Sequence, residues 1–243
     1  MRIAFLCKRK YMSKDVILDR YARLYEIPYQ LARLGHEVRG FCFSYQQAES
    51  GSWQHEAAPG TLAWRSTGRG KLFASSLLTY PSSLLYELRS FKPDLIIAAS
   101  DIPHVVLGHL LARKLGVLFV ADLYDNFEGF GQARIPGFVS LLRYAVRNAD
   151  LVLTTSEPLR EMVEKVYHSK GKVIAMPSTI DTAVFKPLEK KQCRLDLGLP
   201  ENGILIGTAG GLLEERGIGE LYQAWPQISA KHHHLPRLWP GSL

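Results

Sequence analysis

The feature of this sequence that most limits its fold is the repeated alternation of short apolar runs with longer segments of helical period. The runs are rich in β-branched residues. They read RIAFLC, EVRGFCF, DLIIAAS, VLFVAD, DLVLTT, KVIAMP and ILIGTAG. Strands that alternate with helices pair in parallel, because each helix carries the chain back across the sheet. The sequence therefore predicts an α/β protein, with a Rossmann-like parallel sheet and helices on both faces.

Helices are expected between these runs wherever apolar residues recur at a period near 3.6. The expected ranges are 18–34, 76–90, 105–115, 138–148 and 157–167. The first of them buries a face that includes Leu24 and Pro28, and it ends at Gly35, which accepts a left-handed cap. Ser156 is a natural N-cap for the last.

The strand and helix pattern breaks once, between Pro177 and Pro200, where prolines and charges cluster. We therefore expect three regions: an N-terminal domain at 1–178, a linker at 179–202 and a further region at 203–243. The stretch GTAGGLLEERGIGELYQAW then restarts a strand, a glycine turn and a helix. Because one such unit cannot bury both faces of a sheet, we expect the chain to stop early in a second Rossmann-like domain, with an aperiodic tail.

The three cysteines, Cys7, Cys42 and Cys193, have neither disulfide-framework nor zinc spacing, so a reducing compartment and no metal are expected. His232, His233 and His234 are adjacent, but neighbouring side chains point apart, so a disordered tail is expected here instead of a metal site. No apolar run reaches the length of a signal-peptide core or a membrane span.

The net charge of +7 is uneven, because residues 1–40 carry nine Lys or Arg against four Asp or Glu. Such a region suits an anionic membrane surface, a phosphorylated substrate or a nucleic acid, unless it is simply a solvated basic face. No nucleic-acid-binding module is recognisable, so nucleic acid is not expected as a partner.

Ligands of open parallel sheets bind beyond the carboxyl ends of the strands, so the polar residues that follow each run are the candidates for a site. They are Lys8, Arg9, Lys10, Ser100, Asp101, His104, Asp122, Tyr124, Asp125, Asn126, Glu128, Ser156 and Glu157. The first run is followed by CKRKYMSKD, which has no glycine. A dinucleotide site needs GxGxxG at that place, so NAD is disfavoured.

Six stretches of the chain resemble, in order and spacing, the GT-B glycosyltransferases of family 4. They are IPYQLARLGHEV, KPDLIIAAS, LARKLGVLFVADLYD, NADLVLTTSE, MPSTIDTAVFKPL and GTAGGLLEERGIGELYQAW. The resemblance implies two Rossmann-like domains that face a cleft. The first domain would hold mainly the acceptor, and the second mainly a nucleotide-activated sugar.

The resemblance also implies a retaining, metal-independent transfer that needs no cofactor besides the nucleotide sugar, with the leaving diphosphate helping to deprotonate the acceptor. Tyr124 and Asp125 stand where the family commonly has a His-Asp pair. Ser178 and Thr179 replace the family's Asn-Gly before Ile180.

Site roles follow from residue chemistry together with the resemblance. We assign catalysis to Asp125, Tyr124 and His104, the last as a proton acceptor, although such a His more often caps a helix. Substrate binding is assigned to Ser100, Asp101, Glu128, Gly210, Gly211 and Arg216. The carboxylates suit sugar hydroxyls, and Arg216 at a helix start suits a diphosphate. Solvated loop carboxylates, ordinary turn glycines and a solvent-facing Arg are the plainer alternatives.

The expected activity is transfer of a sugar from a nucleotide-activated donor to a glycan or lipid-linked acceptor, in cell-envelope or exopolysaccharide biosynthesis. Alone, a truncated chain is expected to be inactive. A cytoplasmic location is expected, with Lys8, Arg9, Lys10 and Lys14 favouring peripheral contact at the inner, anionic face of a membrane. A nucleotide-sugar epimerase of the same architecture and a non-catalytic binding module remain the alternatives.

Overall fold

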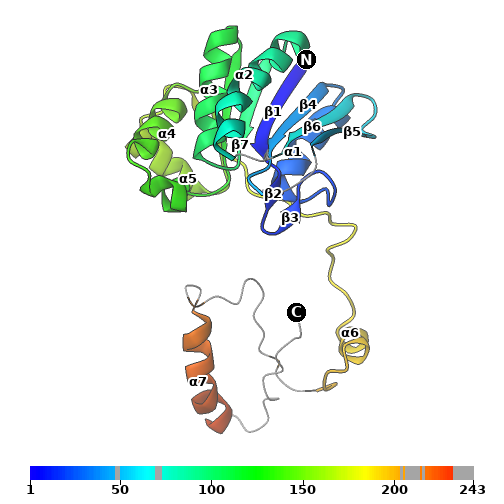
Figure 1. Cartoon of the computed structure of the whole chain (residues 1–243). Coiled ribbons are helices and arrows are strands. Elements are labelled where there is room, and N and C mark those ends of the chain that lie inside the picture. The colour runs from blue at the N-terminus through cyan, green and yellow to red at the C-terminus, as the bar shows by residue number, and fades with distance from the viewer. Residues whose placement is uncertain (47–49, 69–72, 203–204, 206–213, 215–216, 232–243) are drawn as a thin grey trace. The chain divides into compact units, whose positions relative to one another are not determined.

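The computed structural model describes residues 1–46, 50–68, 73–202, 205, 214 and 217–231. The chain divides into two compact units, Met1–Thr179 and Ile180–Leu243. The first unit is built around one sheet (Figure 1). The functional division into an acceptor-side domain, a linker and a donor-side domain stays a prediction.

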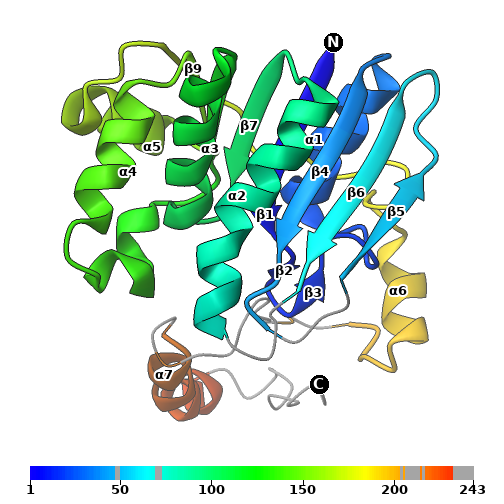
Figure 2. The ribbon, with the colours of Figure 1, turned by 45° about the horizontal axis from the view of Figure 1, so that its top comes forward.

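The sheet of the first unit has eight strands in the order β10-β9-β8-β7-β1-β4-β6-β5. Every neighbouring pair is parallel except β5 and β6. The strands are β1 (Arg2–Lys8), β4 (Glu37–Phe43), β5 (Gly51–His55), β6 (Thr61–Thr67), β7 (Leu95–Ala99), β8 (Leu118–Leu123), β9 (Leu151–Thr154) and β10 (Lys172–Ala175). The chain moves from β1 toward β5 and then returns to the other side of β1 at β7, which makes a topological switch point between β1 and β7 (Figure 2). The predicted Rossmann-like parallel sheet is confirmed.

Two strands at one end of the sheet and a small hairpin were not expected from the sequence. β5 and β6 form an antiparallel pair at the edge of the sheet, with Trp53 opposite Trp64. Buried and exposed residues alternate along β6, because its Leu62 and Trp64 face one side of the sheet only. A search for continuous apolar runs misses such a strand. The hairpin pairs β2 (Lys10–Tyr11) with β3 (Lys14–Asp15).

The expected helices of the first unit are all present, with shifted ends. They are α1 (Ala22–Arg33), α2 (Phe73–Phe91), α3 (Ile102–Leu115), α4 (Phe138–Arg147) and α5 (Glu157–Met162), which continues as a π-helical turn, Val163–Tyr167. α1 begins later than expected, because the Asp15 carboxylate accepts the N–H groups of Ile17 and Leu18 and ties that stretch into a turn. Ser156 caps α5 through the N–H of Leu159, as predicted.

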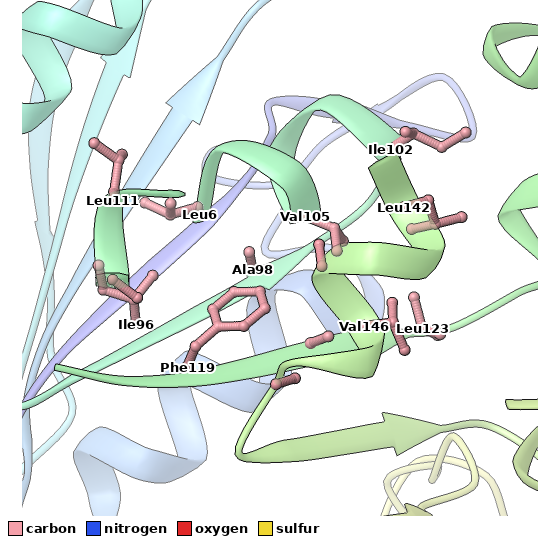
Figure 3. Close-up of a cluster of buried hydrophobic side chains, with 14 of the residues drawn as sticks. Leu6, Ile96, Ala98, Ile102, Val105, Leu111, Phe119, Leu123, Leu142 and Val146 are labelled. Carbon is pink, nitrogen blue, oxygen red and sulfur yellow. The ribbon is translucent and has the colours of Figure 1, made fainter. Parts of the chain in front are cut away.

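Both faces of the sheet are covered. Alternate residues of β1 face opposite sides: Leu6 joins the cluster under α2, α3, α4 and α5, whereas Phe5 joins the cluster with α1. Figure 3 shows the first cluster, in which Ala98 and Phe119 of the sheet lie against Val105 of α3. Two buried layers of this kind hold the strand ends in fixed positions.

The second unit contains two described helices, α6 (Lys190–Asp196) and α7 (Ile218–Lys231). α6 lies within 179–202, the range expected to connect two domains; the Glu189 carboxylate caps this helix by accepting the N–H of Gln192. The expected strand at 204–209 lies outside the described residues except for Leu205. Within the described part of the chain, no helix is both long and apolar enough to cross a membrane.

Candidate functional site

The carboxyl ends of β1, β7 and β8 meet at the switch point, and three predicted site segments come together there. Ser100 and Asp101 follow β7, Tyr124 follows β8, and Lys8 is the last residue of β1. β1 pairs with β7, and β7 pairs with β8, so these residues lie on adjacent strands. Crevices at switch points are the usual ligand sites of open α/β sheets.

Ser100 connects the three strand ends. It is fully buried, and its hydroxyl oxygen accepts the N–H of Lys8 at 2.8 Å. Its carbonyl accepts the Tyr124 hydroxyl at 2.9 Å. Ser100 also has a φ of 86°, a left-handed conformation that costs a non-glycine residue about 1–3 kcal/mol and is found most often at functional sites. Ser100 therefore ties the ends of β1, β7 and β8 together.

Asp101 and His104 form a buried pair at the start of α3. The Asp101 carboxylate accepts the backbone N–H of His104 at 3.0 Å, and its Oδ1 lies 2.6 Å from His104 Nδ1. Burial by itself raises the pKa of Asp101, but His104 and then Lys8 outweigh it, so the pKa falls below its ordinary value. The carboxyl group is therefore ionised, and Nδ1–H donates to it; in the neutral form of the ring, Nε2 is then the acceptor.

Asp101, and not His104, is the N-cap of α3, because the Asp101 carboxylate accepts the N–H of His104; His104 itself lies in the first turn of the helix. Its side chain is 3% exposed. Within the described ranges, Nε2 has no hydrogen-bond partner. A carboxylate that fixes the imidazole tautomer is the arrangement that makes Nε2 a directed hydrogen-bond or proton acceptor.

Lys8 lies among aromatic rings at the same edge. Its Nζ is 5.5 Å from the ring centre of Tyr11, 6.0 Å from that of Tyr124 and 5.8 Å from that of Phe130. Burial lowers the pKa of Lys8, while Asp101 acts in the opposite direction. No salt bridge joins Lys8 to any carboxylate among the residues described. A partly buried ammonium beside aromatic faces suits a phosphate or sugar oxygen.

The predicted carboxylates at the end of β8 have separate environments. Asp125 is exposed, and its Oδ1 accepts the N–H of Asn126. Glu128 instead receives two hydrogen bonds from Arg143, at 2.7 and 2.8 Å. The bond from Arg143 is the main reason that the pKa of Glu128 falls. Asp125 is thus available to a ligand, whereas Glu128 is engaged in an ion pair.

The expected basic patch needs a correction at Arg9. Lys10 and Lys14 are exposed, but Arg9 is 2% exposed and its Nε donates to Asp15 at 2.8 Å. The guanidinium also lies 4.7 Å from the Trp53 ring centre. Arg9 therefore stabilises the segment after β1 and is not a surface cation, because a buried charge needs a paired partner.

Sequence reasoning missed a second buried ion pair beside the strand ends. Arg23 of α1 donates from Nε and Nη2 to Asp122 of β8, at 2.7 to 3.1 Å, and from Nη1 to the Met176 carbonyl at 2.6 Å. Asp122 is fully buried, which raises its pKa, while Arg23 lowers it. Nothing in the sequence links residues 99 positions apart.

Part of the predicted site cannot be placed. Gly210, Gly211 and Arg216, assigned to the donor side, lie outside the described residues, as do His232, His233 and His234. Within the described part of the chain, no group of three or more His, Cys, Asp or Glu side chains could hold a metal ion.

Comparisons with known proteins show the family and the fold of the chain. The sequence model of the protein family described as Glycosyltransferase Family 4 matches residues 23–184 of this chain. The D-inositol 3-phosphate glycosyltransferase of Stackebrandtia nassauensis is 28% identical over 139 residues, which are 56% of this chain and 30% of that protein. TuaC of Bacillus subtilis, named as a teichuronic acid biosynthesis glycosyltransferase, is 28% identical over 172 residues, 70% of this chain and 42% of that protein. The chain spans less than half the length of either relative.

Solved structures share the fold. Sucrose-phosphate synthase from Thermosynechococcus elongatus has a TM-score of 0.71 at 16% identity, over 93% of this chain and 60% of that chain. HepE from Anabaena, solved in complex with UDP, has a TM-score of 0.59 at 16% identity, over 93% and 58%. UDP-GlcNAc 2-epimerase from Methanocaldococcus jannaschii has a TM-score of 0.54 at 9% identity, over 99% and 66%. The chain belongs to glycosyltransferase family 4, and the expected fold, a Rossmann-like part of a GT-B protein, is confirmed.

Proposed function

We propose that this chain takes part in the transfer of a sugar from a nucleotide-activated donor to an acceptor hydroxyl, and that its first unit binds the acceptor. One observation carries the proposal: Lys8 and the Asp101–His104 pair converge with Tyr124 at the switch point of the sheet. Family membership supports the reaction class. The UDP complex of HepE makes a UDP-sugar the first donor to test.

The site offers separate groups for separate parts of an acceptor. The Lys8 ammonium would bind a phosphate or hydroxyl oxygen, and the neighbouring rings of Tyr11 and Tyr124, 4.9 Å apart, would pack against a sugar ring. Asp125 would accept a hydrogen bond from the reacting hydroxyl and orient its oxygen. In the transfer, the acceptor oxygen bonds to the anomeric carbon, the bond to the diphosphate breaks, and the departing diphosphate takes the hydroxyl proton. We include in the proposal that the transfer retains the anomeric configuration and needs no metal ion.

The cellular setting is proposed from the relatives. TuaC is named for teichuronic acid biosynthesis, a cell-envelope polymer, and this supports a glycan or lipid-linked acceptor. A cytoplasmic location at the inner membrane face is part of the proposal, and it rests on the exposed Lys10 and Lys14 instead of on Arg9.

Acceptor binding by the 243-residue chain tests the proposal. Isothermal titration with a lipid phosphate, a sugar phosphate and a neutral glycan should identify a phosphate-bearing acceptor that binds. Lys8→Met should weaken its binding about tenfold or more, since a hydrogen bond to a charged group contributes about 1.5–3 kcal/mol. Lys10→Met removes the same charge from an exposed position and should change binding less than twofold. Equal effects of the two variants, or no acceptor binding, would refute the assignment.

An incubation without acceptor distinguishes the epimerase alternative from the transferase. The chain is incubated with UDP-glucose and UDP-GlcNAc without any acceptor, and the nucleotide sugars are analysed by NMR. We expect them unchanged, because transfer needs an acceptor hydroxyl. An isomerised nucleotide sugar would replace the transferase proposal with the epimerase.

A further inference from the structure

A cavity of about 160 Å³ lies beside the switch point, between the end of β4 and the helices α2 and α3. Its buried lining consists of Phe43, Tyr80 and His104. Partly exposed residues complete the lining: Tyr45, Pro81, Pro103 and Leu107. The cavity therefore has a buried floor and a rim that reaches the surface. Most of the lining is apolar, which favours an apolar occupant.

Two polar atoms interrupt this apolar lining. His104 Nε2 and the Tyr80 hydroxyl are both buried, and neither has a hydrogen-bond partner within the ranges that the structure describes. Leaving a buried polar group unpaired costs about 1–3 kcal/mol, so each atom calls for a partner. The two rings lie at a centroid distance of 6.5 Å. Both atoms belong to residues that line the cavity.

The hydrogen-bonding capacity of His104 Nε2 and the Tyr80 hydroxyl determines which ligand group can pair with them. Because Asp101 Oδ1 engages His104 Nδ1 at 2.6 Å, Nε2 is the acceptor in the neutral form of the ring and a donor in the protonated form. The Tyr80 hydroxyl can donate or accept. A ligand hydroxyl meets either need, since it carries both a donor and an acceptor. Burial is the main reason that the pKa of Tyr80 rises, so its proton stays in place.

We propose that this cavity is an acceptor subsite for a compact apolar group that carries a hydroxyl, with His104 Nε2 and Tyr80 as its hydrogen-bonding partners. The assignment to the acceptor rests on the proposed function. The size agrees, because an apolar cavity of about 150 Å³ holds a benzene ring. A phenolic ring or a short branched alcohol fits that space. His104 then determines acceptor specificity through its hydrogen bond to the hydroxyl of the apolar group, while Asp125 contacts the reacting hydroxyl.

The cavity itself is tested with small probes on the 243-residue chain. Phenol, prenyl alcohol and toluene are titrated while the His104 ring and the α3 amides are followed by NMR. Phenol or prenyl alcohol should bind at least fivefold more tightly than toluene, which has no hydroxyl. Tyr80→Phe removes only one oxygen from the floor and should reduce this preference. Equal binding of toluene and both alcohols, or no binding of any probe, would overturn the proposal.

Filling the cavity provides the matched control. Leu107→Trp places a large ring at the rim and should abolish probe binding. Leu110→Trp, on the same helix at a residue that is 56% exposed, should leave it unchanged. Spectra of both variants must retain the dispersion of the folded chain. Probe binding that survives Leu107→Trp in a folded variant would place the ligand elsewhere and contradict the assignment.

The acceptor assignment has its own readout. Two phosphate-bearing acceptors are compared by titration. They are identical except that one carries a phenol or prenyl alcohol group and the other lacks it. The one with the group should bind at least fivefold more tightly, and Leu107→Trp should remove that difference. If the cavity binds phenol but the two acceptors bind with equal affinity, the assignment of the cavity as an acceptor subsite is wrong. If neither acceptor responds to Lys8→Met, it is the proposed function that fails, and the probe titrations still report on the cavity.

Discussion

Replacing Arg23 with Met is expected to destabilise the first unit strongly, because it leaves Asp122 as a fully buried carboxyl group without its cation. The guanidinium makes three hydrogen-bond contacts with the carboxylate, and the side chains are 7% and 0% exposed. Removing one partner of a buried ion pair costs about 3–5 kcal/mol. The variant also loses the hydrogen bond to the Met176 carbonyl, so the end of β10 loses its tie to α1.

The loss should depend on pH in a direction set by Asp122. Burial already raises the pKa of this carboxyl group above its ordinary value, against the influence of Arg23. Without Arg23 the pKa rises further. The folded state then binds a proton that the unfolded state releases, so the free energy of unfolding of the variant falls as the pH rises from the ordinary carboxyl pKa to the raised one. The destabilisation is therefore smaller in acid and complete at neutral pH.

Urea unfolding followed by NMR signals of the β8 amides measures this effect, since β8 belongs to the first unit. The wild type, Arg23→Met and the double variant Arg23→Met with Asp122→Leu are compared at about pH 5 and about pH 7. The double variant should recover most of the lost free energy, because an apolar pair can replace a buried ion pair at little cost. A loss below about 1 kcal/mol in Arg23→Met, or no pH dependence, would refute the reasoning.

Three further outcomes are expected. Gly40→Ala should lower the free energy of unfolding by about 1–3 kcal/mol, because the added Cβ would overlap the buried Trp64 ring; an unchanged urea midpoint would contradict this. Ser156→Ala should cost about 1 kcal/mol through loss of the α5 cap, with faster exchange of the Leu159 amide as the readout, and full protection would count against it. Limited proteolysis should cut first within 177–192, where every residue is exposed, and leave a resistant fragment of the first unit; first cuts inside the sheet would exclude this.

Sequence periodicity was enough to predict the parallel strands and the helices between them. Continuous apolar runs, such as the one that became β7, can only be buried on both faces, and this requires helices on each side. Local signals were equally readable: Ser156 caps its own helix, and Gly35 ends α1 with a φ of 91°. The edge strand β5 and its neighbour β6 were not predicted, because their one-sided burial is a property of their place in the sheet.

The candidate site was only partly readable. The rule that ligands bind beyond strand ends located Lys8, Asp101 and Tyr124, but it could not say which polar groups were already paired. Arg9 and Glu128 carry ordinary charges in the sequence, yet the fold engages them with Asp15 and Arg143. Such pairing depends on side-chain positions across elements.

The fold class, the family and the edge of the sheet that carries the candidate site could all be predicted from the sequence, because they follow from local periodicity and from the order of motifs. The contacts between distant residues became visible in the folded chain alone: Arg23 with Asp122, and Tyr80 with His104 around one cavity. The physical reason is that burial and pairing are set by packing between elements remote in the chain, and neither is encoded in any single stretch.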